Sequence, residues 1–306
     1  MGDILFEQLV QVGCGIDVHQ NLIVATIRKG NNQEETREFT AYTSSLKKLR
    51  DWCKEEGVSH VAMESTGVYW NPVFNVLESD FEILLVNARH VKNVPGHKTD
   101  KKDSAWLSKL LLSGLLKGSF IPPRDIRDLR DLVRYRKKIV GQIASEKNRI
   151  IKTIEDGNIK LSSVLSDING VAGTKIINSL IEGQTDIEEL MKFYHGKFKV
   201  SREDFRLALE GFLTAHHRFM LQLYKDSIAE KERLIERLDD EIDKAVEAYR
   251  VELDLLQTIP GVGKSSAIAI ISETGADMSK FPNEHHLSSW SGMSPGNNES
   301  GGKKKR

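Results

Sequence analysis

The sequence has little cysteine, no net excess of charge and no long apolar run. Its two cysteines, Cys14 and Cys53, have neither zinc-site spacing nor the number that a disulfide framework needs, which fits a reducing cytoplasm. No apolar run reaches transmembrane length, and the first residues lack a signal peptide's basic start and apolar core. We therefore expect a cytoplasmic protein without a membrane partner. Because Lys+Arg and Asp+Glu are equal at 44 each, a nucleic-acid partner must be argued from local clusters of charge.

The first third of the chain, residues 8–118, alternates short apolar strands with amphipathic helices. This order is typical of an α/β domain with a mixed sheet. Phe39 is expected to open the third strand, and Cys53 falls on the apolar side of a helix, where a core role is expected. Strands are predicted at 12–17, 22–27, from 39, at 60–63 and at 81–86, and helices at 44–56, 69–79 and from about residue 100.

Four acids fall at the ends of these elements. Asp17 lies at the end of the first strand, Glu64 follows the fourth strand, and Asp100 and Asp103 are three residues apart near the start of a helix. Two divalent metals need several carboxylates that converge from different elements, and nucleases of the ribonuclease-H or resolvase type have this layout. The set predicts a site for Mg²⁺ or Mn²⁺. Each acid also has an ordinary explanation, as a turn aspartate or as an acid in a first helical turn.

Basic residues surround the last two acids. Lys98, Lys101 and Lys102 crowd Asp100 and Asp103, so metal and a phosphate backbone could be held side by side. A solvated, charged helix start remains the alternative.

The second region, residues 119–250, is predicted to be long helices. Residues 124–160 carry 11 Lys/Arg against 6 Asp/Glu, with apolar residues at helical spacing. Its basic face suits phosphate contacts, and a solvated coiled-coil face is the alternative. Residues 203–249 form a second helical stretch that pairs with the first in an antiparallel coiled coil, or serves as a dimer arm. The candidate contacts on the basic helix are Arg127, Arg130, Arg134 and Lys137.

The third region, residues 251–306, contains the stretch TIPGVGKSSAIAIISETG. It is similar to a helix-hairpin-helix, whose turn offers backbone N–H groups to a DNA phosphate. Gly261 and Gly263 permit close approach of the backbone, and Lys264 adds positive charge. A plain corner between two helices is the alternative, and it is favoured for the weaker copy of the pattern at 161–183.

Three motifs carry a resemblance to a known family. The stretches GIDVHQNLIVATI, AMESTGVYW and VNARHVKNVPGHKTDKKDSAWLSKLL resemble the DEDD transposases and DNA invertases of bacterial insertion sequences, the Piv/MooV-like or IS110 family. The resemblance implies a RuvC-like, ribonuclease-H-like N-terminal domain whose four acids fall on Asp17, Glu64, Asp100 and Asp103. It also implies a C-terminal transposase domain, in which the family's nucleophilic serine falls on Ser300.

The resemblance also suggests partners. It implies DNA, as element ends and target, a structured guide RNA, and a homo-oligomer, either a dimer or a tetramer. Relatives continue past this serine, so we expect the C-terminal domain here to be truncated.

Three functions stay open at this point. The first is a transposase or recombinase that uses metal and Ser300. The second is a structure-selective nuclease, similar to a Holliday-junction resolvase, in which water replaces the serine. The third is an inactive, truncated remnant that only binds nucleic acid.

Overall fold

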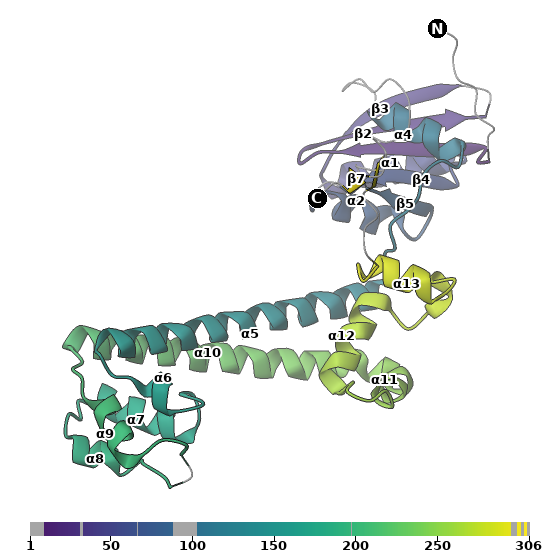
Figure 1. Cartoon of the computed structure of the whole chain (residues 1–306). Coiled ribbons are helices and arrows are strands. Elements are labelled where there is room, and N and C mark those ends of the chain that lie inside the picture. Colours follow the sequence, from purple (N-terminus) through teal and green to yellow (C-terminus); the bar gives the residue numbers. More distant parts are fainter. Residues whose placement is uncertain are drawn as a thin grey trace. The chain divides into compact units, whose positions relative to one another are not determined.

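The computed structural model describes residues 9–30, 33–65, 67–87, 103–196, 198–294, 299–300 and 303–304. The chain forms two compact units, Met1–Ile121 and Pro122–Arg306 (Figure 1). The predicted regions 119–250 and 251–306 both fall almost entirely in the second unit. No helix in the described part of the chain is long and apolar enough to cross a membrane.

A five-stranded mixed sheet forms the centre of the first unit. Its order is β3-β2-β1-β4-β5, in which β2 is antiparallel to both of its neighbours, β1 and β3, while β4 is parallel to β1 and β5 is parallel to β4. The turn of the first hairpin is closed by the His19 N–H, which donates to the Leu22 carbonyl at 2.9 Å. The strands are β1 Val12–Val18, β2 Leu22–Lys29, β3 Glu34–Thr40, β4 His60–Glu64 and β5 Glu82–Val86.

Helices cover both faces of this sheet. Helices α1 (Thr43–Glu55) and α2 (Trp70–Leu77) pack on the face that carries Cys14 and Ile16, and the Cys14 thiol meets Cys53 of α1 there. Both cysteines are free and buried, so Cys53 is a core residue, as predicted. Helix α4 (Asp103–Leu112) lies on the other face, where Leu107 and Leu110 pack with Val86 (Figure 1).

The third strand begins earlier than the sequence suggested. Phe39 lies near the end of β3 and not at its start. Most of β3 is exposed and polar, so it has no apolar alternation that would reveal it. Its pairing with β2 makes it a strand.

The second unit is helical, apart from a two-stranded ribbon formed by β6 and β7. Helices α5 and α10 run antiparallel, because Ile126 packs with Val246 at one end and Ile154 with Leu221 at the other. The elements are α5 Arg124–Asp156, α6 Leu161–Val164, α7 Val171–Ile181, α8 Ile187–Met191, α9 Arg202–Leu209, α10 Ala215–Val246, η1 Glu247–Tyr249, α11 Arg250–Gln257, α12 Lys264–Thr274, η2 Met278–Lys280, α13 Glu284–Trp290, β6 Glu299–Ser300 and β7 Lys303–Lys304.

The second helical stretch is not continuous. Residues 210–214 separate α9 from α10, and Thr214 caps α10 by accepting a hydrogen bond from the His217 N–H. A Cβ on Gly211 would lie 2.4 Å from the Gly157 carbonyl oxygen, so this segment packs closely against the end of α5. The break follows from this glycine and this cap.

Candidate active site

Asp17 and Glu64 lie at the carboxyl ends of neighbouring parallel strands. The register pairs Ile16 of β1 with Met63 of β4, and the next residue on each strand is Asp17 or Glu64. Register partners in a parallel pair point to the same face of a sheet. Both carboxylates therefore lie on one face of the sheet at the carboxyl ends of its strands, where open α/β sheets gather their binding groups. We call this place the acidic edge.

Helix α4 brings a third acid to this edge. It packs so closely on β1 that a Cβ on Gly15 would lie 2.1 Å from the Ser104 carbonyl oxygen and 2.4 Å from the Ser108 nitrogen. Asp103 is the first residue of α4 and precedes Ser104 directly. Asp17 follows Gly15 by two residues and so shares its face of the sheet. The start of α4 thus lies over the strand segment that leads to Asp17.

Asp17 interacts electrostatically with both Asp103 and Glu64. Burial raises the pKa of Asp17, and the negative charges of Asp103 and Glu64 raise it further. His19 opposes these effects, because its Nε2 lies 3.1 Å from Asp17 Oδ2 and its charge favours the ionised carboxylate. A cation between the acids would relieve their mutual repulsion.

The donor chemistry fits a hard divalent cation, because Mg²⁺ and Mn²⁺ prefer carboxylate oxygens. Within the described ranges, however, no three His, Cys, Asp or Glu side chains are close enough to form a metal-binding group. The predicted fourth acid, Asp100, lies outside these ranges, as do Lys98, Lys101 and Lys102. The described acids therefore supply part of a ligand set.

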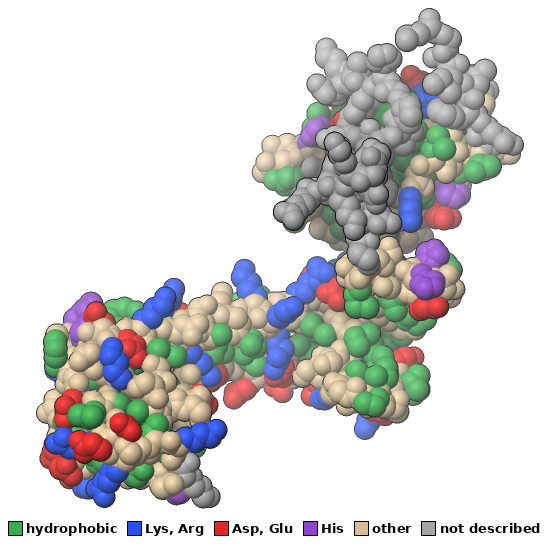
Figure 2. Space-filling model, viewed as in Figure 1, with side chains coloured by type: hydrophobic (Ala, Val, Ile, Leu, Met, Phe, Trp, Pro, Cys, Tyr) green, Lys and Arg blue, Asp and Glu red, His purple; other side chains and the backbone are tan. Residues whose placement is uncertain are grey.

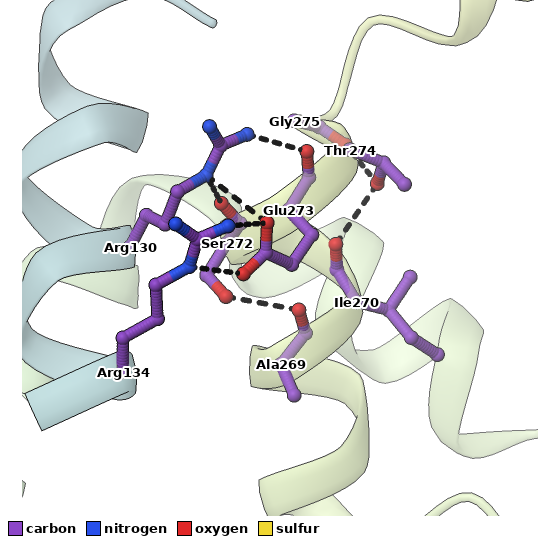
Figure 3. A network of polar contacts seen from close by, with 8 residues as sticks. All are labelled: Arg130, Arg134, Ala269, Ile270, Ser272, Glu273, Thr274 and Gly275. Atoms are coloured by element: carbon purple, nitrogen blue, oxygen red, sulfur yellow. Dashed lines mark hydrogen bonds and ion pairs between the residues drawn. The ribbon is translucent and has the colours of Figure 1, made fainter. Parts of the chain in front are cut away.

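The predicted basic contacts on α5 divide into two groups. Lys137 is exposed, and Arg127 donates to the Pro122 carbonyl at 3.2 Å. In Figure 2, Lys and Arg side chains follow the upper edge of the long helices. Arg130 and Arg134 instead hold α12 (Figure 3).

Arg130 and Arg134 bind the C-terminal end of α12 in different ways. Arg130 donates to the carbonyl oxygens of Ser272 at 3.0 Å and Glu273 at 2.7 Å (Figure 3). Arg134 makes two hydrogen bonds of 2.8 Å to the Glu273 carboxylate. The Arg130 side chain is 17% exposed and that of Arg134 61%, so the first contact is the better shielded.

The glycine turn lies between α11 and α12. Gly261 has φ +86°, a conformation that favours glycine, and Gly263 is the N-cap residue of α12. Lys264 opens α12 and forms an ion pair of 2.7 Å with Asp243 of α10. The predicted order of a helix, a glycine turn and a second helix is therefore present.

Ser300 lies in the short strand β6, where it pairs with Lys303 of β7. Gly301 and Gly302, which connect the two strands, lie outside the described residues. This hairpin belongs to the second unit, and the three described acids belong to the first.

Two family models match the chain. A DEDD transposase model of the IS110 type covers residues 14–158, a range that includes all four predicted acids. The model of the transposase IS116/IS110/IS902 family covers residues 253–306, which include the glycine turn and Ser300. The chain is an IS110-family transposase. A comparison with curated proteins finds no match.

Membership of the IS110 family places the protein among enzymes that bind DNA and recombine it. The expected resemblance is thus confirmed at both ends of the chain.

Sequence reasoning missed several residues that shape the acidic edge. Gly15, Thr26 and Ser104 let α4 lie against the sheet, and His19 contacts Asp17. The spacing Asp-x-His was a readable signal for the last of these. Contacts between Thr26 and Ser104, 78 residues apart, leave no local pattern in the sequence.

Proposed function

We propose that this transposase cleaves and rejoins DNA strands at the ends of its element, at an acidic site that holds Mg²⁺ or Mn²⁺. The proposed metal ligands are Asp17, Glu64 and Asp103, which the structure describes, and Asp100, which lies outside the described residues. One observation carries the proposal: two neighbouring parallel strands carry Asp17 and Glu64 at their carboxyl ends, and the helix that begins at Asp103 packs over the same end of the sheet.

When bound, the metal would polarise the phosphate and stabilise the charge that develops during strand cleavage. The work of the protein is to hold the carboxylates together despite burial and mutual repulsion, which raise the pKa of Asp17 in that order of importance. His19 orients the Asp17 carboxylate through its 3.1 Å contact.

A RuvC-like, ribonuclease-H-like assignment of the first unit is part of the proposal. The order β3-β2-β1-β4-β5 supports it, as does the combination of an antiparallel hairpin with parallel strands that are covered on both faces. Acids at the carboxyl ends of central strands agree with such a fold.

Ser300 is the proposed nucleophile. Its hydroxyl oxygen would form a bond to phosphorus as the bond to the leaving deoxyribose oxygen breaks, and the serine proton would pass to a base or to solvent. Support comes from the family match over 253–306 and from the W-x-G-x-x-P-x-x-x-x-SG-GK pattern of the sequence.

Nucleic acid would contact the second unit at two places. The exposed Lys137 on α5 and the turn with Gly261, Gly263 and Lys264, as a helix-hairpin-helix-like element, offer phosphate contacts. The bonds of Arg130 and Arg134 to α12 favour a supporting role for them. A structured guide RNA and a homo-oligomer complete the proposal on the family resemblance alone.

A structure-selective nuclease is the second candidate. It is favoured by the fact that the three described acids all come from the first unit, whereas Ser300 belongs to the second. In that case metal-activated water would replace Ser300 as the nucleophile.

One experiment separates the two candidates. The full chain is incubated with DNA that carries the element ends and with Mg²⁺, and denaturing gels show nicked strands and any protein–DNA adduct. We expect an adduct with the native protein, none with Ser300→Ala, and an unchanged adduct with the control Ser291→Ala.

The other outcomes are equally informative. If Ser300→Ala still nicks DNA and the native protein forms no adduct, the nuclease is correct. If Asp17→Asn and Glu64→Gln leave cleavage at the native level, the acidic site is not the catalytic one.

A further inference from the structure

A buried hydroxyl pair joins helix α4 to the sheet. Thr26 Oγ1 of β2 lies 2.8 Å from Ser104 Oγ in the first turn of α4, and a second 2.8 Å contact joins Thr26 to Thr36 of β3. Thr26 is 0% exposed and Ser104 3%, so these hydroxyls depend on each other for hydrogen bonds. The helix is therefore attached by a polar contact within an otherwise apolar surface.

A second polar contact lies one helical turn further along. Arg28 Nε donates to Ser108 Oγ at 3.4 Å, and the Arg28 guanidinium also pairs with Glu34 of β3. Two residues of a strand span about 6.6 Å and four residues of a helix about 6 Å, so the two contacts match in spacing. We call Thr26, Arg28, Ser104 and Ser108 the polar seam.

The neighbouring strand leaves room for the polar seam. Gly15 and Gly13 of β1 are the register partners of Thr26 and Arg28. A Cβ at Gly15 would collide with the Ser104 carbonyl oxygen at 2.1 Å, and one at Gly13 would meet Leu111 at 2.9 Å. The helix thus rests on bare backbone of β1 while its serines reach the side chains of β2.

The polar seam ends at the proposed ligands. Ser104 follows Asp103 directly in the chain, and Asp17 lies two residues beyond Gly15 on the same strand. Apolar contacts alone would tolerate small shifts of α4 along the sheet. If α4 slipped by one residue relative to β1 and β2, its first residue would move by about 1.5 Å along the helix axis and rotate by about 100° around it. Such a slip would separate Ser104 from Thr26 and carry Asp103 away from Asp17.

From this geometry we infer that Thr26 and Ser104 are positioning residues, which hold Asp103 over Asp17 so that both carboxylates can bind one cation. The inference rests on the proposed metal site and adds two residues, neither of which touches the metal or DNA.

The test compares two substitutions of one buried side chain. Thr26→Val keeps the shape of the side chain and removes its hydroxyl, whereas Thr26→Ser keeps the hydroxyl. Binding of Mn²⁺ to the full chain is measured by electron paramagnetic resonance, and hydrogen exchange of the α4 amides by mass spectrometry. Ser272→Ala is the matched control, because it removes a buried serine hydroxyl from the second unit.

We expect Thr26→Val and Ser104→Ala each to weaken Mn²⁺ binding about tenfold, as loss of a supporting contact commonly does. Exchange of the α4 amides should become faster in both variants. Thr26→Ser should restore both readouts to near the native values, and Ser272→Ala should change neither.

Two results would overturn the inference. Native Mn²⁺ affinity in Thr26→Val would show that the hydroxyl pair positions no ligand, whatever happens to exchange. If Asp17→Asn leaves Mn²⁺ binding unchanged while Thr26→Val still speeds exchange of the α4 amides, the proposed metal site itself is wrong. The polar seam would then hold a helix without serving a metal.

Discussion

Asp17 is a carboxylate whose burial costs stability. Because its pKa is higher in the folded chain than in the unfolded chain, the folded chain binds the proton more tightly. Between those two pKa values, unfolding releases the proton, so stability falls as the pH rises. When no cation is present, the ionised form of Asp17 therefore stabilises the folded first unit less than the protonated form does.

Asp17→Asn should raise the thermal midpoint of the first unit in the presence of a chelator at pH 7. It should also weaken the fall in stability as the pH rises above the ordinary pKa of an aspartate, because the titrating group is gone. Calorimetry across this pH range measures both effects. Glu38→Gln, at an exposed position of β3, removes one negative charge from the same unit as a control and should leave the thermal midpoint near the native value. A lower midpoint in Asp17→Asn would contradict the electrostatic account.

Gly15 is required by the approach of α4. Gly15→Ala should destabilise the first unit by about 3 kcal/mol or more, since the new methyl group meets backbone atoms that cannot turn aside. Gly141→Ala is the matched control in the middle of α5, where a Cβ meets nothing within 4 Å. It should stabilise the protein by about 0.5–1 kcal/mol. Urea unfolding measures both, and equal effects would refute the close contact.

At the scale of elements, two arginines hold α12 on α5 with unequal strength. Arg130→Ala should cost about 1.5–3 kcal/mol, because a shielded guanidinium is lost from two helix carbonyl oxygens. Arg134→Ala should cost less than about 1 kcal/mol, because its ion pair is exposed to solvent. Denaturant unfolding of the two variants measures both losses of stability. A larger loss for Arg134→Ala than for Arg130→Ala would contradict the claim that Arg130 makes the stronger contact.

Elements were predictable where burial leaves a pattern. The hairpin of β1 and β2, the strand before Glu64 and the long helix α5 carry apolar residues at the spacing of their structure. Strand β3 was placed wrongly, because it is an exposed edge strand defined by pairing. The break before α10 was missed although Gly211 and Thr214 mark it in the sequence.

The candidate site was predictable only in part. Asp17 and Glu64 follow apolar strands, so their placement at one sheet edge could be inferred from local sequence. The contacts that place Asp103 join residues distant in sequence, namely Gly15, Thr26 and Ser104. No periodicity records them, and only the folded chain reveals them.

At the scale of the whole molecule, two units with separate cores should unfold in separate steps. Calorimetry of the full chain should show two transitions. Mn²⁺ should raise the one that belongs to the first unit, whereas Arg130→Ala should lower only the other. A single transition that shifts with both changes would show that the units unfold together.

The most direct measurement is anomalous diffraction from crystals of the full chain grown with Mn²⁺. We expect a manganese peak within bonding distance of carboxylate oxygens of Asp17, Glu64 and Asp103, and the loss of that peak in Asp17→Asn. Manganese bound elsewhere, or no peak at this edge at a saturating Mn²⁺ concentration, would contradict the proposed metal site.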